Sequence, residues 1–136
     1  MIRTFTILGE PVGEGRPRTA IRGQHATIYA APKSAQGRAL AAQQMAAEHT
    51  GAPIEQCVQV AIVAVTRRPK SVPKRDGTGR LVRPTKPDVD NIAKSCLDAL
   101  VQGGVLADDR QVHRLVVERV TAAVDEVPRT MITVGA

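Results

Sequence analysis

Aromatic side chains are almost missing from this chain of 136 residues, which contains one Phe, one Tyr and no Trp. Proteins that hold nucleic acid by stacking its bases need several exposed rings, so this composition argues against recognition by extensive base stacking. No stretch of about 18 residues is free of charged and turn-forming residues, and we expect no segment that spans a membrane. The N-terminal residues are too few and too alternating in polarity for a signal peptide, so we expect a cytoplasmic protein.

Cysteine is also scarce, and its two positions lack the spacing of a zinc site. Cys57 and Cys96 both fall inside apolar segments, and we interpret them as small core residues of a protein in a reducing compartment. The sequence contains no P-loop motif, no glycine-rich dinucleotide motif after a strand and no nucleophile elbow. P-loop enzymes, dinucleotide-dependent enzymes and α/β-hydrolases are therefore unsupported.

The length and the polarity pattern predict one small α+β domain over residues 1–136. We expect a mixed or antiparallel sheet of about four or five strands, packed by two main helices. Residues 57–66 are apolar on nearly both faces and predict the most central strand. The expected helices are 32–50 and 89–102; the other expected strands are 2–8, 26–30, 111–122 and 129–134, the last at an edge, with a loop over 9–19.

Positive charge is concentrated in one segment, residues 67–86. It has eight basic residues and one acid, which leaves −1 for the rest of a chain whose net charge is +6. Its prolines and glycines predict a mobile loop, called the basic loop below. A solvated surface loop is one interpretation; the other is a site for a polyanion such as nucleic acid. The basic residues are Arg67, Arg68, Lys70, Lys74, Arg75, Arg80, Arg83 and Lys86.

Aspartates stand at both ends of the second expected helix. Asp88 and Asp90 precede or begin it, and Asp108 and Asp109 follow it, with Lys94 one turn after Asp90. Taken singly, these residues have ordinary explanations as a helix cap, a first-turn charge, a turn and an ion-pair partner. Together, and beside a basic loop, they are typical of a Mg²⁺ site for phosphoryl chemistry, provided that the chain returns and brings both acidic ends together.

Two further residues have open interpretations. The Tyr29 ring either stacks on a base or sugar or, as we favour, is a half-buried anchor of a short strand. His113 either acts as a ligand or base beside the acidic turn or, as we favour, packs its ring against the sheet.

The order and spacing of these motifs resemble the RusA family of Holliday junction resolvases, in particular its phage and prophage branch. The segment Lys86–Asn91 (K-P-D-V-D-N), then Lys94, Asp98–Leu100 and Asp108–Val112, resembles the family signature. Gly15–Arg18 (G-R-P-R) and Tyr29–Lys33 resemble its N-terminal motif. The chain departs from some relatives at Pro87, where they have a basic residue, and at Glu14, where the phage branch often has lysine.

The resemblance implies a homodimeric, Mg²⁺-dependent endonuclease, for which Mn²⁺ is expected to substitute, that cuts four-way or branched DNA in recombination and repair. The host would be a bacterial or phage-infected cell. By motif position, Asp88, Asp90 and Asp109 are implied as metal-binding catalytic acids, with Asp108 as a further metal ligand, and Lys94 as the essential lysine. Asn91, Asp98 and Gln111 would support the site. DNA contacts are expected from the basic loop and from Arg16, Arg18 and Arg22.

Two other functions stay open at this point. A non-catalytic DNA-binding protein with a structural acidic cluster would bind DNA without Mg²⁺-dependent nicking. A nuclease of the same chemistry could act on flaps or forks, because selectivity for shape depends on how two protomers are arranged.

Overall fold

Strand β4 (Val58–Thr66) lies inside a four-stranded sheet, as its apolar, β-branched sequence predicts. The strand order is β1 (Ile2–Leu8), β6 (Arg129–Gly135), β4 and β5 (Val112–Thr121). β4 pairs with β5 in parallel and with β6 antiparallel, and β6 also pairs antiparallel with β1, so the sheet is mixed. The computed structural model describes residues 1–13, 18–23, 25–29 and 32–136.

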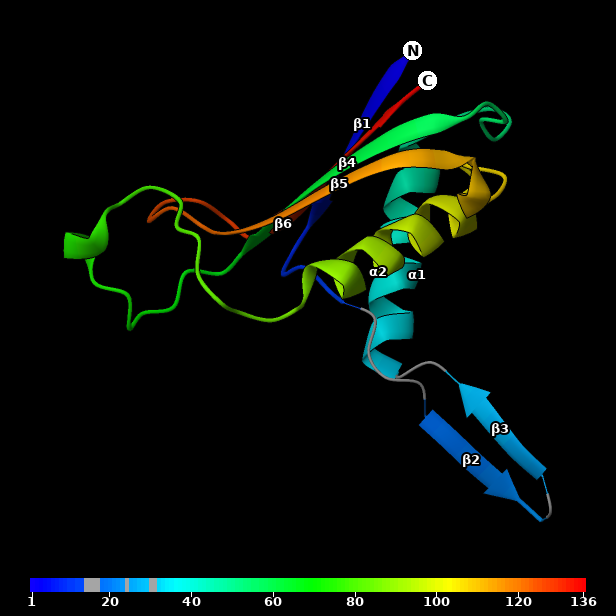
Figure 1. Cartoon of the computed structure of the whole chain (residues 1–136), viewed down its shortest axis with the longest axis horizontal. Helices are drawn as coiled ribbons and strands as arrows, with labels where there is room; N and C mark the ends of the chain where they lie inside the picture. Colours follow the sequence, from blue (N-terminus) through cyan, green and yellow to red (C-terminus); the bar gives the residue numbers. More distant parts are fainter. Residues whose placement is uncertain (14–17, 24, 30–31) are drawn as a thin grey trace.

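Helices α1 (Pro32–Glu48) and α2 (Val89–Gln102) pack against one another and lie on one face of this sheet (Figure 1). The core between these layers contains Phe5 of β1, Met45 of α1, Ile62 of β4 and Leu100 of α2, all with an exposed fraction of 2% or less. The two helices and the sheet confirm the predicted α+β domain. No helix in the described part of the chain is long and apolar enough to cross a membrane.

A separate hairpin, β2 (Arg18–Arg22) and β3 (His25–Tyr29), projects beyond the N-terminus of α1 (Figure 1). The predicted loop over 9–19 is therefore wrong at its end, because β2 begins at Arg18. The predicted short strand over 26–30 matches β3 within one residue, and Ala30 lies outside the described residues.

Several predictions about single positions and edges are wrong. The last strand is not an edge, since β6 lies between β1 and β4. Cys57 is exposed, whereas Cys96 is buried in the core, where burial raises the pKa of its thiol to about 12. His113 is exposed on β5 rather than packed against the sheet.

The basic loop has more structure than its prolines and glycines indicated. It contains a short 3₁₀ helix, η1 (Lys74–Asp76), and Leu81 forms an antiparallel bridge with Thr121 of β5. The loop and the turn between β5 and β6 extend together away from the helices (Figure 1). The predicted mobility of this loop stays a prediction.

Candidate active site at the two ends of helix α2

Helix α2 presents one acidic pair at its N-terminus, Asp88 and Asp90, called the N-terminal acidic pair. Asp88 is in the N-cap position with extended backbone angles, but its side chain makes no cap hydrogen bond. Asp90 is in the first turn, and both residues are exposed. The interpretation of Asp88 as the N-cap residue is thus confirmed in position, but its side chain does not cap the helix and the residue is exposed. Lys94 is exposed one turn later.

The opposite face of α2 holds this end of the helix in place. Ile92, Ala93 and Cys96 are buried at three- and four-residue spacing, as the sequence predicted, but Val89 is 44% exposed. The helix therefore packs its apolar stripe on the sheet while the two acids and the lysine stay accessible.

Two neighbours that sequence reasoning missed fix the backbone before Asp88. The guanidinium of Arg119 on β5 donates from Nη1 to the Pro87 carbonyl at 3.1 Å and from Nη2 to the Arg83 carbonyl at 3.5 Å. Gly13 packs so closely that a Cβ there would lie 2.6 Å from Cβ of Pro87 and 3.1 Å from Cβ of Asn91. The sequence shows Arg119 only as a charged residue inside a predicted strand, and its register with Ala64 is known from the structure alone. Gly13 carries no comparable signal.

The second acidic pair, Asp108 and Asp109, follows α2 and is called the C-terminal acidic pair. Asp108 caps the 3₁₀ helix η2 (Asp109–Gln111): its Oδ1 accepts from the Arg110 backbone N–H at 2.8 Å and from Arg110 Nε at 3.1 Å. These bonds, the backbone one first, lower the pKa of the Asp108 carboxyl. Asp108 is therefore engaged in the turn, whereas Asp109 is exposed.

Other motif residues hold this C-terminal end together. Gln111 donates from Nε2 to the carbonyls of Ile54 and Gln56 at 2.6 and 2.9 Å, and its Oε1 accepts from the Asp108 N–H at 2.8 Å. Asp98 on α2 forms an ion pair with Arg38 of α1 at 3.5 Å. Asp98 and the C-terminal acidic pair line one open hollow of about 460 Å³.

The two acidic pairs do not meet within one chain. They lie at opposite ends of a helix of 14 residues, which corresponds to about 21 Å (Figure 1). Among the described residues, no group of three or more His, Cys, Asp or Glu side chains could hold a metal ion. The expected return of the chain that would bring both pairs together is therefore wrong for a single protomer. The reason is that α2 is straight and uninterrupted between them.

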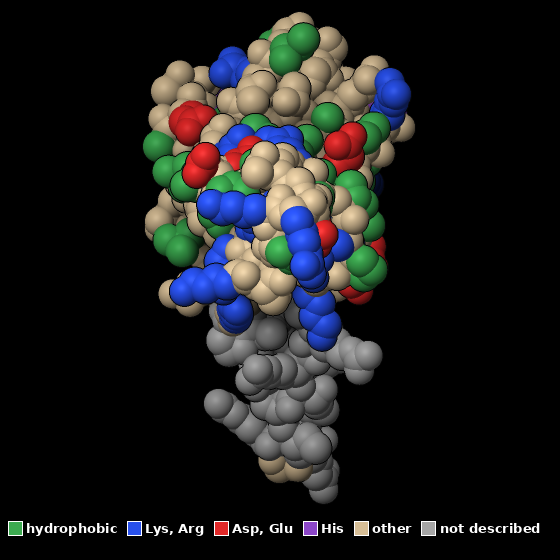
Figure 2. All heavy atoms as spheres, turned by 90° about the vertical axis from the view of Figure 1, so that its left-hand side faces the viewer, with side chains coloured by type: hydrophobic (Ala, Val, Ile, Leu, Met, Phe, Trp, Pro, Cys, Tyr) green, Lys and Arg blue, Asp and Glu red, His purple; other side chains and the backbone are tan. Residues whose placement is uncertain are grey.

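The basic residues of the basic loop differ in whether their side chains are used within the protein or are exposed. Arg68 and Arg80 are bound within the protein: Arg68 donates to the carbonyls of Gly77 and Gly79, and Arg80 pairs with Glu126. Arg83 is half-buried. The remaining five are exposed, and Figure 2, seen from the side of this loop, shows Lys and Arg side chains gathered on that face. These five are Arg67, Lys70, Lys74, Arg75 and Lys86.

The predicted N-terminal DNA contacts are only partly placed. Arg18 and Arg22 are the first and last residues of β2, and Arg16 lies outside the described residues. The Ser34 hydroxyl donates to the Gly13 carbonyl at 3.2 Å, and Gly13 in turn packs on Pro87. The segment that leads toward the hairpin is therefore fixed beside the N-terminal acidic pair.

The described fold is a small α+β domain with exposed carboxylates at the start of α2, next to a loop rich in Lys and Arg. The chain belongs to the RusA family, since the family model described as "Endodeoxyribonuclease RusA" matches residues 9–135. It is also similar to a protein of Bacillus subtilis (strain 168) named "Uncharacterized protein YqaN". The two are 35% identical over 121 residues, which cover 85% of this chain and 84% of that protein. The resemblance inferred from the motifs is confirmed.

Proposed function

We propose that this protein is a Mg²⁺-dependent, homodimeric DNA endonuclease that resolves four-way junctions by paired nicks during recombination and repair. The observation that carries the proposal is the pair of exposed carboxylates, Asp88 and Asp90, at the start of α2, where the basic loop leads into the helix. The Asp88 carboxylate makes no hydrogen bond that caps the helix. Membership of an endodeoxyribonuclease family supports the reaction. Selectivity for four-way junctions is a proposal that rests on the family resemblance.

The carboxylate oxygens of the two acidic pairs are ligands of the kind that Mg²⁺ prefers, although the two pairs lie at opposite ends of α2. Mg²⁺ prefers one or two carboxylates, several waters and phosphate oxygens of the substrate. Asp88 and Asp90 would supply such carboxylates, and Asp109 is the better candidate in the second pair, because Asp108 already caps η2. The bound ion would polarise the phosphate and lower the pKa of an attacking water.

We propose further that each site is completed by two chains. A two-fold axis that sets two copies of α2 antiparallel would bring the N-terminal acidic pair of one protomer near the C-terminal acidic pair of its partner. β5 ends the strand order and α2 packs against it, so two β5 edges paired about such an axis would set the helices side by side. Leu115 and Val116 of β5 are 39% and 43% exposed, which suits an edge that is covered in a dimer.

The chain's own residues then have separate tasks. The exposed cations of the basic loop bind the DNA backbone by charge, which suits recognition of shape rather than of bases. Lys94, one turn from Asp90 on the exposed side of α2, would neutralise negative charge that develops on the phosphate. Arg119 and Gly13 fix the backbone that carries Asp88.

The direct test is cleavage of labelled four-way, forked and linear DNA by the wild type and by Asp90→Asn, each with Mg²⁺, with Mn²⁺ and with EDTA. We expect the wild type to nick four-way DNA in either metal and not in EDTA. Asp90→Asn should lose cleavage by about 100-fold or more while still binding the junction in EDTA, because only the metal-binding charge is removed. Glu48→Gln, which removes one exposed charge at the end of α1, is the matched control and should cut normally.

Retained cutting by Asp90→Asn would contradict the catalytic proposal. Binding without nicking by the wild type in either metal would favour a non-catalytic DNA-binding protein. Preference for forked DNA over four-way DNA would keep the chemistry and change the substrate.

A further inference from the structure

We propose that Glu126 is a positioning residue that holds the basic loop in a shape ready for DNA, so that removing this negative charge weakens DNA binding. The inference rests on the proposed role of the basic loop in binding DNA. It concerns a carboxylate that is outside both acidic pairs and that the family motifs do not include.

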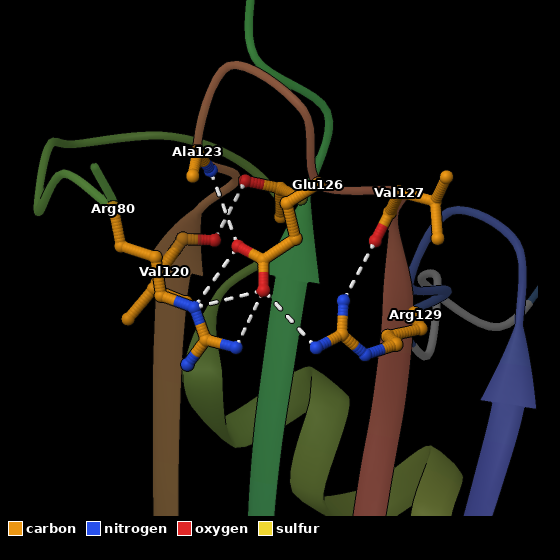
Figure 3. A network of polar contacts seen from close by, with 7 residues as sticks. Arg80, Val120, Ala123, Glu126, Val127 and Arg129 are labelled. Carbon is orange, nitrogen blue, oxygen red and sulfur yellow. Dashed lines mark hydrogen bonds and ion pairs between the residues drawn. The ribbon is translucent and has the colours of Figure 1, made fainter. Parts of the chain in front are cut away.

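The Glu126 carboxylate gathers donors from three segments (Figure 3). Arg80 of the basic loop donates from Nε to both oxygens at 2.9 and 3.0 Å and from Nη2 to Oε2 at 2.6 Å. Arg129 at the start of β6 donates to Oε2 at 3.0 Å, and the Ala123 backbone N–H donates to Oε1 at 3.1 Å. The Glu126 side chain is only 15% exposed, so these charge-assisted bonds are partly shielded from water.

The contact with Arg80 occurs where the basic loop touches the rest of the fold. On one side of it, Leu81 and Thr121 exchange backbone hydrogen bonds at 3.1 and 2.8 Å. On the other side, the Val124 N–H donates to the Thr78 carbonyl at 2.9 Å. Glu126 therefore lies between two backbone contacts, so that the loop is attached at three points to the end of β5 and to the turn that joins β5 to β6.

Beyond this attachment the loop closes on itself. Arg68 donates from Nη2 to the Gly77 carbonyl at 2.6 Å and from Nη1 to the Gly79 carbonyl at 3.1 Å. The 3₁₀ helix η1 then carries Lys74 and Arg75, which are exposed. The exposed Lys74 and Arg75 thus lie in a segment that is closed by the contacts of Arg68 and attached to the fold through Arg80, and Glu126 binds Arg80.

Simple electrostatics and this arrangement predict opposite effects of removing the charge. A carboxylate inside a basic patch lowers the local positive potential, so its neutralisation should tighten binding to a polyanion. If Glu126 instead keeps the loop ordered before DNA binds, its loss leaves the loop disordered in the free protein. The free energy needed to order the loop is then subtracted from the free energy of binding, and DNA binds more weakly. Tighter DNA binding after neutralisation of Glu126 would favour the electrostatic effect, and weaker binding would favour the positioning role.

The test compares Glu126→Gln with Asp125→Asn, the neighbouring exposed carboxylate, in EDTA at several salt concentrations on four-way DNA. Each substitution removes one negative charge, so the net charge of the protein rises by the same amount in both variants. We expect Asp125→Asn to bind as tightly as the wild type or more tightly, and Glu126→Gln to bind at least about 5-fold more weakly. With Mg²⁺ and saturating DNA, Glu126→Gln should cut at the wild-type rate, since its effect is on binding and not on the reaction.

Equal or tighter binding by Glu126→Gln, relative to Asp125→Asn, would overturn the inference. Hydrogen exchange of the wild-type protein without DNA tests it independently of how the variant folds. The amides of Leu81, Thr121 and Val124 should be protected, and free exchange at all three would overturn it.

The double variant Lys74→Gln, Arg75→Gln separates this inference from the proposed function. Weaker binding by the double variant, together with tight binding by Glu126→Gln, would remove only the positioning role. Unchanged binding by the double variant would remove the DNA-binding role of the basic loop, and the positioning role would fall with it.

Discussion

Gly13 packs closely against the segment that carries the N-terminal acidic pair. It precedes the hairpin, its carbonyl accepts from Ser34, and its Cα faces Pro87 and Asn91 on the segment that enters α2. A methyl group at this position cannot be accommodated without a shift, because its distance of 2.6 Å from the Pro87 Cβ is far below ordinary contact. The residue thus packs the end of the segment after β1 against the backbone that carries Asp88.

We therefore predict that Gly13→Ala lowers the rate of junction cleavage by about 10-fold or more, since small displacements of catalytic groups have effects of this size. Cleavage and binding assays on four-way DNA check it. Gly135→Ala is the control, since its Cβ would meet nothing closer than the Met1 carbonyl at 3.9 Å. Normal cleavage by Gly13→Ala would show that the contact with Pro87 does not position the acids.

Glu126 gives a pH dependence of stability with a definite sign. Its hydrogen bonds, those from Arg80 first, lower the pKa of this carboxyl from 4.5 to about 2. A lowered pKa in the folded state gives stability that is fully present above pH 4.5 and is lost as the pH falls toward 2. We predict that urea unfolding of the wild type and of Glu126→Gln differs above pH 4.5 and converges near pH 2. A difference that does not change with pH would contradict the ionic origin of the contact.

At the scale of single elements, the bounds of a helix or strand are predicted best where the residue pattern of that segment alone determines its structure. The bounds of α2 agree with the prediction because its apolar stripe and its terminal glycines act locally. β4 was predicted within one residue because its apolar run suits a strand covered on both edges. The hairpin strand β2 was missed, since its flanking glycines and prolines indicated a loop and its pairing with β3 lies outside local pattern.

Strand β5 also acts on the site through one residue, Arg119, whose guanidinium connects the sheet to the segment before α2. The Nε atom of Arg119 is buried and has no hydrogen-bond partner in the described part of the chain, which offsets part of the stabilisation that this side chain provides. That arrangement is consistent with a role in holding the Pro87 carbonyl rather than in adding stability.

We predict that Arg119→Met lowers cleavage by about 10-fold while binding of four-way DNA in EDTA changes little. Arg119→Lys, which keeps a donor near the Pro87 carbonyl, should recover part of the activity. A further check is hydrogen exchange of the backbone over 83–90, which should be faster in Arg119→Met. Equal loss of binding and cleavage in both variants would indicate a general disruption of β5 instead.

At the scale of the whole molecule, the order of the strands and the placement of distant residues depend on contacts between segments far apart in the sequence, which local residue patterns do not predict. The last strand enters the sheet between β1 and β4, although nothing in its own pattern distinguishes that position from an edge. The motifs identified Asp88, Asp90, Asp108 and Asp109 as a set, but in one protomer the two pairs lie at opposite ends of α2, a helix about 21 Å long. The residues could be selected from the sequence, whereas their meeting in one site requires, under the proposal above, a second copy of the chain.

The most direct measurement is therefore the activity of a purified heterodimer of Asp90→Asn and Asp109→Asn, co-expressed with two different affinity tags. If each site uses the N-terminal pair of one protomer and the C-terminal pair of the other, both substitutions fall in one site and the second site is intact. We predict that each homodimer is inactive and that the heterodimer nicks one strand at about half the wild-type rate per dimer. A heterodimer as inactive as the two homodimers would contradict the account, because it would show that each site uses acids of one chain only.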